Sequence, residues 1–322
     1  MTEASNQSNP QQSGKHRIFA ALRAWWFVPI ILVAVVEIIL HISQTRPQIG
    51  EKDWPGIRES LESQIQPADL VAFSPLWIGP IARMNLGDGL MTIQRVARAD
   101  ESRFPRAFEV SLGSSRNPAF STWPMEHEER IGGLRLRRFK NPGYMPVIDD
   151  LVGHADGSRM TAEIVREEPD LCTWRVGRPV TGGIHFGTAH PAARYHCKRY
   201  VWVGETVSAD INYTPRRCIY APPPGYGGVL RLRFGEVQFG AKLHGHHALY
   251  VESERHKKGA PVRIVFSSGG ESLGEAIHED GQGWVGFVID TPDLQGKTAE
   301  LVAEISAEWV NPRAYCFEAT TR

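Results

Sequence analysis

The chain has 322 residues, and its 36 lysines and arginines balance 36 aspartates and glutamates, so its formal net charge is zero. A hydrophobic content of 42% excludes a disordered chain. The neutral balance argues against a nucleic-acid partner, because phosphate-binding surfaces need an excess of basic residues. The 31 glycines and 22 prolines favour many turns and short strands over long helices.

The N-terminal region predicts a single membrane anchor. Residues 1–23 are polar and are interpreted as a disordered cytoplasmic tail, and residues 24–42 are almost entirely apolar, which predicts a transmembrane helix. Basic residues before the apolar run place the N-terminus in the cytoplasm and the bulk of the chain outside it, in the periplasm or extracellular space. A cleaved signal peptide is the alternative interpretation.

One acidic residue, Glu37, falls within this apolar run. A carboxyl group in a membrane span is costly, although less so towards an interface. We interpret Glu37 either as a contact with a second membrane helix or as a protonated side chain near the lipid headgroups.

The four cysteines all lie beyond the predicted anchor, at Cys172, Cys197, Cys218 and Cys316. Their number is even and no C-x-x-C pair occurs, which argues against a zinc ribbon or a thioredoxin-like redox pair. An oxidising compartment then favours two disulfides. Four cysteines allow three pairings.

Residues 53–112 predict a small α/β unit. A helix starting at Asp53 has one apolar stripe formed by Trp54, Ile57, Leu61 and Ile65. A buried-type strand follows at 70–75, then a second helix near 76–86 and a strand at 106–112. This alternation predicts parallel strands. No glycine-rich phosphate loop follows the first strand, so no nucleotide site is expected.

After residue 112 the pattern changes to short alternating or β-branched runs separated by glycine, proline and aspartate. We divide this part into a β-rich middle region, 113–214, and a β-sandwich domain, 215–322, with the proline-rich segment 221–228 as a linker or rigid turn. The predicted fold class is mainly β with a small α/β unit, ending in an antiparallel, jelly-roll-like sandwich.

Two segments resemble known families. The final third of the chain, from about Cys218, contains LRLRF, PVRIVFSSGGESLGEA, GWVGFVIDTPDLQGKTAEL and RAYCFEA, and it resembles galactose-binding-like jelly-roll modules. This resemblance implies carbohydrate binding. It also implies that the first and last strands pair, which favours the disulfides Cys218–Cys316 and Cys172–Cys197. Residues 53–112, with PADLVAFSP, resemble the soluble outer segment that accompanies lipid-linked membrane glycosyltransferases.

Three histidines, His185, His190 and His196, lie within a dozen residues. Their spacing does not place them on one helical face, and on a strand only His190 and His196 share a side. We therefore interpret them as loop histidines rather than as zinc ligands or a general base.

The segment HGHH contains a second group, His244, His246 and His247. On a strand, His244 and His246 point to the same side, which is the minimum for a two-ligand site. We predict a ligand site at these three histidines, at the rim of the sandwich where such modules hold sugars. The alternative is a polar loop. We assign no metal and no cofactor.

Aromatic residues are dense between 174 and 226, and aromatic faces stack on sugar rings. From this group we select Trp202 and Tyr213 as ligand-binding residues. No catalytic residue is assigned, because the sequence has no G-x-S-x-G elbow. The paired carboxylates Asp149 and Asp150 are either glycosidase-type acids or solvated turn charges.

These patterns lead to three functional hypotheses. The first is a membrane-anchored extracytoplasmic binding or accessory protein that binds carbohydrate during envelope glycan assembly, with the lipid bilayer, a glycan and a membrane glycosyltransferase as partners. The second is a hydrolase or transferase that acts on an envelope polysaccharide through acids or histidines within 149–210. The third is a structural assembly partner of a membrane complex.

Overall fold

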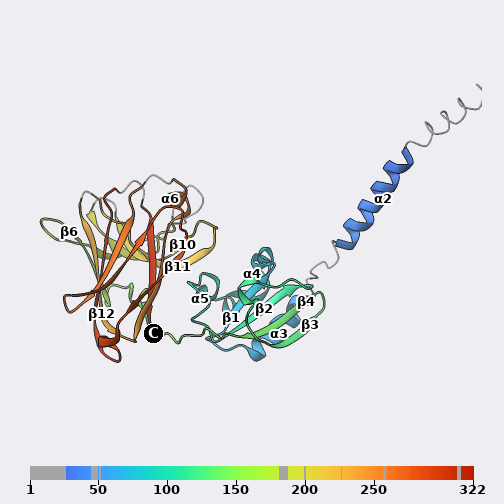
Figure 1. Cartoon of the computed structure of the whole chain (residues 1–322), viewed down its shortest axis with the longest axis horizontal. Helices are drawn as coiled ribbons and strands as arrows, with labels where there is room; N and C mark the ends of the chain where they lie inside the picture. The colour runs from blue at the N-terminus through green and yellow to red at the C-terminus, as the bar shows by residue number, and fades with distance from the viewer. Residues whose placement is uncertain are drawn as a thin grey trace, which may run out of the picture.

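The computed structural model comprises an N-terminal helix, a small α/β unit and a β-sandwich (Figure 1). The described residues are 27–44, 50, 52–180, 188–198, 201–225, 227–256, 259–309 and 313–322.

The N-terminal helix α2 covers Phe27–Gln44. The predicted transmembrane helix over 24–42 is not confirmed: among the described residues, none of the helices combines the length and the apolar character that crossing a membrane demands. Residues 1–26, which include the predicted tail, lie outside the described residues.

The α/β unit contains a four-stranded sheet in the order β1-β2-β4-β3. Strands β1 and β2 are parallel, with Leu70 opposite Ala107. The predicted helix and the two parallel strands are therefore confirmed. The elements of this unit are α3 (Asp53–Gln64), β1 (Leu70–Ser74), η1 (Leu76–Ile78), α4 (Gly79–Leu90), α5 (Ile93–Val96), β2 (Arg106–Leu112), η2 (Pro118–Phe120), β3 (Met125–Ile131) and β4 (Leu134–Lys140).

The amphipathic pattern of α3 explains how this unit packs. Trp54, Ile57 and Leu61 are buried on one side of the helix and pack in one cluster with Phe108 and Val110 of β2. Alternate residues of a strand point to opposite faces of the sheet, so the other face of the same sheet is left for a second apolar cluster. That cluster comprises Leu70, Ala72, Phe104, Ala107, Phe120 and Phe139.

The sandwich packs two antiparallel sheets face to face. One sheet has the order β16-β13-β18-β11-β10-β9-β8, with β5 beside β18, and the other has the order β15-β14-β17-β12-β6-β7. The strands are β5 (Asp149–Asp150), β6 (Met160–Val165), β7 (Asp170–Leu171), β8 (Thr173–Val176), β9 (Ala193–His196), β10 (Trp202–Ala209), β11 (Pro215–Tyr220), β12 (Val229–Gln238), β13 (Lys242–Leu249), β14 (Val262–Ser268), β15 (Glu271–His278), β16 (Val285–Asp290), β17 (Thr298–Ser306) and β18 (Tyr315–Thr321).

In the described part of the sandwich, the short helices are η3 (Leu151–His154), α6 (Val251–His256) and η5 (Pro292–Leu294). Helix α6 follows β13 almost directly. The core between the sheets is built from fully buried aromatic and aliphatic side chains, including Phe234, Phe266 and Phe317.

The strands are grouped differently from the predicted ranges 113–214 and 215–322. Strands β3 and β4 belong to the α/β sheet, because β4 pairs with β2 along its whole length. Strand β10 pairs with β11, from Gly204 opposite Tyr220 to Ala209 opposite Pro215, so no domain boundary lies at 214. The predicted proline-rich linker instead connects β11 to β12, which lie in different sheets.

Both expected disulfides are present. Cys172 bonds to Cys197, and Cys218 on β11 bonds to Cys316 on β18. Strands β11 and β18 are antiparallel neighbours, with Tyr220 opposite Cys316. This agrees with the pairing that the jelly-roll resemblance implied.

Candidate functional site

The histidines of β13 lie on a sheet that the α/β unit contacts. His244 and His246 are two residues apart on the strand, so their side chains share the outer face of the sheet. Their ring centroids are 5.3 Å apart. Opposite His246 on β18 is Glu318, whose Oε1 lies 2.8 Å from His246 Nδ1.

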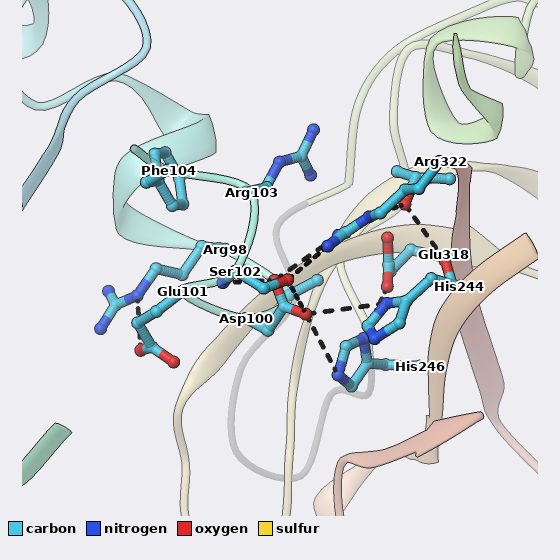
Figure 2. Close-up of polar contacts among 12 residues, drawn as sticks. Arg98, Asp100, Glu101, Ser102, Arg103, Phe104, His244, His246, Glu318 and Arg322 are labelled. Atoms are coloured by element: carbon cyan, nitrogen blue, oxygen red, sulfur yellow. Dashed lines mark hydrogen bonds and ion pairs between the residues drawn. The ribbon is translucent and has the colours of Figure 1, made fainter. Parts of the chain in front are cut away.

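A carboxylate from the other unit faces these two rings. Asp100 lies in the loop between α5 and β2, and its Oδ2 is 3.7 Å from His244 Nδ1 and 3.8 Å from His246 Nε2. Figure 2 shows the three side chains converging. One ligand-type atom from each residue lies within 4.8 Å of the others. All three side chains are only slightly exposed, at 12–17%.

The conformation of Asp100 is fixed by its own loop and by Arg322, which directly follows β18. Ser102 donates its hydroxyl to Asp100 Oδ2 at 2.8 Å and its backbone N–H to Oδ1 at 3.1 Å, which forms a local turn. Arg322 Nη2 lies 3.7 Å from Asp100 Oδ1, and Arg322 also donates to the Ser102 hydroxyl. Arg322 and the Ser102 backbone N–H therefore contact Oδ1, while Oδ2 faces the histidines.

The loop of Asp100 is anchored on the sandwich through its backbone. Trp284 donates its indole N–H to the carbonyl of Ala99 at 2.8 Å, and Arg216 donates to the same carbonyl at 3.2 Å. The Trp284 ring stacks on His246, with centroids 5.7 Å apart and an angle of 3° between the planes. These contacts orient the imidazole and position the loop at the same time.

The ionisation of the cluster follows from burial and from its charged neighbours. Burial first, and then Arg322, lowers the pKa of His244 to about 4. Burial opposes ionisation of Asp100, but Arg322, Ser102 and the two imidazoles together hold its pKa below its usual value. Burial raises the pKa of Glu318, although its hydrogen bond to His246 opposes that rise. Near neutral pH, His244 is therefore an uncharged nitrogen donor beside an ionised Asp100.

The third predicted histidine lies on the other side of β13. His247 is 2% exposed, its Nδ1 lies 2.8 Å from the Tyr315 hydroxyl, and its ring contacts His278 and Phe287. Burial, followed by His278 and His246, lowers the pKa of His247 to about 3. His247 is thus a neutral side chain of the core, and strand alternation separates it from the other two histidines.

The two predicted aromatic ligand residues lie in different environments. Trp202 is 6% exposed and its ring stacks on Tyr220 at 4.1 Å and contacts His190 at 4.6 Å, which leaves little of the ring open to a ligand. Tyr213 is 48% exposed, and the guanidinium of Arg255 covers its ring at 4.6 Å from the centroid.

An open hollow of about 820 Å³ lies beside β8, β9 and β10. Its lining includes the half-buried indole of Trp174, the imidazole of His190, and Glu205, whose side chain is 44% exposed. Trp174 is held by an edge contact with Tyr195 at 4.9 Å. Burial, and then Arg194 and His196, lowers the pKa of His190.

The paired carboxylates Asp149 and Asp150 are engaged in structural contacts. Asp149 bonds to His154 Nε2 at 2.8 Å and accepts the backbone N–H of Gln238 at 3.0 Å. Asp150 pairs with Arg103 at 2.9 Å and caps helix η3. Neither carboxylate is a free solvated turn charge, and these contacts leave the enzyme hypothesis without support from this pair.

Sequence reasoning missed two members of the histidine cluster. Asp100 has the Asp-x-Ser spacing of a local turn, but such a turn carries no information about a strand far along the chain. Glu318 lies on β18, where it and every other residue of the strand are buried, so the strand pattern gives no sign of a functional residue. The pairing of β13 with β18 brings Glu318 to His246, whereas docking of the loop after α5 on the sandwich brings Asp100 there.

Comparisons with known proteins identify carbohydrate-binding modules as structural neighbours. No protein-family model and no curated protein matches the chain. CBM51-2 with the INT domains of Clostridium perfringens ZmpB, in complex with GlcNAc, has a TM-score of 0.31 and 7% identity, over 62% of this chain and 41% of that one. TmCBM61 in complex with β-1,4-galactotriose has a TM-score of 0.23 and 10% identity, over 52% and 87%.

The N-terminal cellulose-binding domain of Cellulomonas fimi β-1,4-glucanase C has a TM-score of 0.22 and 10% identity, over 55% of this chain and 93% of that one. This chain thus spans less than half of the ZmpB structure. Identities and TM-scores this low transfer no residue role to this chain. The resemblance of residues 53–112 to a glycosyltransferase-associated segment stays a prediction.

Proposed function

We propose that this chain is an extracytoplasmic carbohydrate-binding protein whose sugar site is the hollow beside Trp174. The observation that carries the proposal is the composition of that hollow. It combines an aromatic face with polar groups in a volume of about 820 Å³, within the range of small-ligand sites.

The chemistry of the lining suits a sugar. The apolar face of a pyranose ring packs on an indole such as Trp174, and its hydroxyl groups need both donors and acceptors at the edge. The Glu205 carboxylate accepts hydrogen bonds, and Arg217, which donates to Glu205 at 2.6 Å, holds it in place. His190, with its lowered pKa, is neutral at neutral pH and offers one donor and one acceptor.

The proposed location outside the cytoplasm is supported by the two disulfides, because such bonds persist in oxidising compartments. A thiol-alkylation assay on the full chain from its native source tests it. The cysteines should react only after reduction, and four reactive thiols without reduction would argue for a cytoplasmic protein.

A glycan array probed with the full chain tests the binding function. We expect a saturable ligand, and Trp174→Ala should weaken its binding at least about tenfold through loss of the stacking face. Glu205→Gln removes charge without removing volume and should weaken the same ligand. Trp309→Ala is the matched control, because Trp309 is an exposed tryptophan, at 72%, outside the hollow lining.

The two tryptophan variants distinguish a sugar site in the hollow from a site elsewhere on the protein. Equal loss in the Trp174 and Trp309 variants would place the sugar elsewhere. The absence of any hit from folded, disulfide-bonded protein would contradict carbohydrate binding.

A second candidate function, docking of a protein partner, is favoured by an exposed apolar surface on the α/β unit. We define this η1–α4 surface by Leu76, Trp77, Ile81 and Met84, which are 76%, 59%, 39% and 86% exposed. Exposed apolar side chains grouped in this way mark interaction surfaces. If this surface docks a partner, a photocrosslinker at position 77 should form a defined adduct that the variant Met84→Ser weakens, and a crosslinker at 309 should not.

A further inference from the structure

The cluster of Asp100, His244 and His246 is separate from the proposed sugar site and has unused binding capacity. His244 Nδ1 is buried and has no hydrogen-bond partner. Glu318, only 1% exposed, also has one carboxylate oxygen, Oε2, without a partner. Buried polar atoms are normally satisfied, so each of these atoms calls for an explanation.

We propose that Asp100, His244 and His246 together bind one divalent transition-metal ion of the zinc type, which links the α/β unit to the sandwich. The two imidazoles come from β13 of the sandwich and the carboxylate comes from the loop after α5. The ion therefore bridges two units of the chain.

The donor set selects the class of metal. Two neutral imidazole nitrogens and one carboxylate oxygen suit zinc and its transition-metal neighbours. Calcium and magnesium prefer sites built entirely from oxygen ligands. Three protein ligands leave at least one position for water, and the small exposed fraction of the three side chains gives the ion a path of entry.

The geometry requires only small adjustments. Zinc–ligand bonds of about 2.0–2.1 Å in a tetrahedral site place ligand atoms about 3.3 Å apart. The observed separations from Asp100 Oδ2 are 3.7 Å to His244 Nδ1 and 3.8 Å to His246 Nε2. These two distances need to shorten by about half an ångström, and the two imidazole nitrogens, which lie within 4.8 Å of each other, must also approach; side-chain torsions allow both movements.

Glu318 occupies the place of an outer-shell carboxylate. It bonds to His246 Nδ1 at 2.8 Å while His246 Nε2 faces Asp100. When Nδ1 donates to the carboxylate, the lone pair of the ring is on Nε2, directed towards the proposed ion. Stacking of Trp284 on the same ring limits its rotation.

The guanidinium groups of Arg322 and Arg103 lie near the cluster but do not block it. Arg322 approaches Asp100 at Oδ1, on the oxygen that is turned away from the histidines. Arg103 pairs with Asp150 at 2.9 Å, so three carboxyl groups, those of Asp100, Asp150 and Glu318, lie near the two guanidinium groups.

Metal binding to the full chain tests the proposal. Protein stripped with a chelator and dialysed is titrated with zinc, and separately with cobalt, whose visible spectrum reports nitrogen and oxygen coordination. We expect one equivalent per chain, with binding lost or weakened at least a hundredfold in Asp100→Asn and His246→Gln. Glu318→Gln, an outer-shell change, should weaken binding about 10–100-fold.

His127→Gln is the matched control, because His127 is an exposed histidine on β3. It should leave the stoichiometry and the affinity unchanged. Circular dichroism and disulfide content confirm that each variant is folded, so that a loss of binding reports on the ligands. Substoichiometric binding, unchanged binding in both ligand variants, or equally tight binding of calcium would overturn the proposal.

Discussion

Removal of the Cys218–Cys316 disulfide tests how strongly the sandwich depends on covalent closure. The bond joins residues 98 apart in sequence, whereas Cys172–Cys197 joins residues 25 apart. In the chain-entropy description the stabilisation grows with the logarithm of loop length, giving about 4.7 kcal/mol for the longer loop and about 3.5 kcal/mol for the shorter one. Replacing each pair by alanine should therefore destabilise the protein by different amounts, with the larger loss at Cys218 and Cys316.

The assay is urea unfolding of the full chain, followed by tryptophan fluorescence and circular dichroism, with both double-alanine variants compared with the oxidised wild type. The wild type under reducing conditions should lose more stability than either variant, because both loops are then open. A smaller loss for the Cys218 and Cys316 variant than for the other would refute the loop-entropy reasoning and show that the sheet contacts around β11 and β18 suffice.

Three further predictions concern buried groups. Arg137→Met removes the ion-pair partner of the buried Glu109, 2.7 Å away. It should lower the free energy of unfolding in urea by about 3–5 kcal/mol. A loss below about 1 kcal/mol would mean that Glu109 finds another partner. The pKa of His247, about 3, and that of His244, about 4, mean that only the unfolded chain protonates these two imidazoles between pH 6.5 and 5, so each should lower folding stability by about 2 kcal/mol between pH 7.5 and 5. His247→Phe should remove the share of His247 from that slope, and an unchanged slope would contradict this origin. Gly245→Ala should lower the melting temperature and the free energy of unfolding, the latter by about 1–3 kcal/mol. The methyl group of the alanine would lie 2.5 Å from the backbone carbonyl oxygen of Glu318. An unchanged melting temperature would show that the two strands move apart easily to make room for the methyl group.

Local patterns predicted much of the secondary structure. The stripe of Trp54, Ile57 and Leu61 predicted α3, and the alternation at 106–112 predicted β2 with its observed bounds. The neighbour of each strand is harder to predict, because period-two patterning shows that one face is buried but does not identify the adjacent strand. The pattern alone therefore neither joins β3 and β4 to the α/β sheet nor pairs β10 with β11 across position 214.

The histidine cluster was predictable only in part for the same reason. Strand alternation places His244 and His246 on one side and His247 on the other, and the structure confirms that separation. The partner Asp100 depends on how the loop after α5 docks on the sandwich, through contacts such as the one between Trp284 and Ala99. Interactions of this kind join residues far apart in the chain, and no short motif encodes them.

The position of β18 determines when the sandwich is able to assemble. This strand is the last of the sandwich in chain order, yet it lies between β13 and β11 in the middle of its sheet. Until residues 315–321 emerge during synthesis or export, the sheet is divided into two halves with exposed edges, which is the state most prone to aggregation. Folding of the sandwich is therefore a late event that waits for its last strand, and a folding helper that shields those edges would act during that interval.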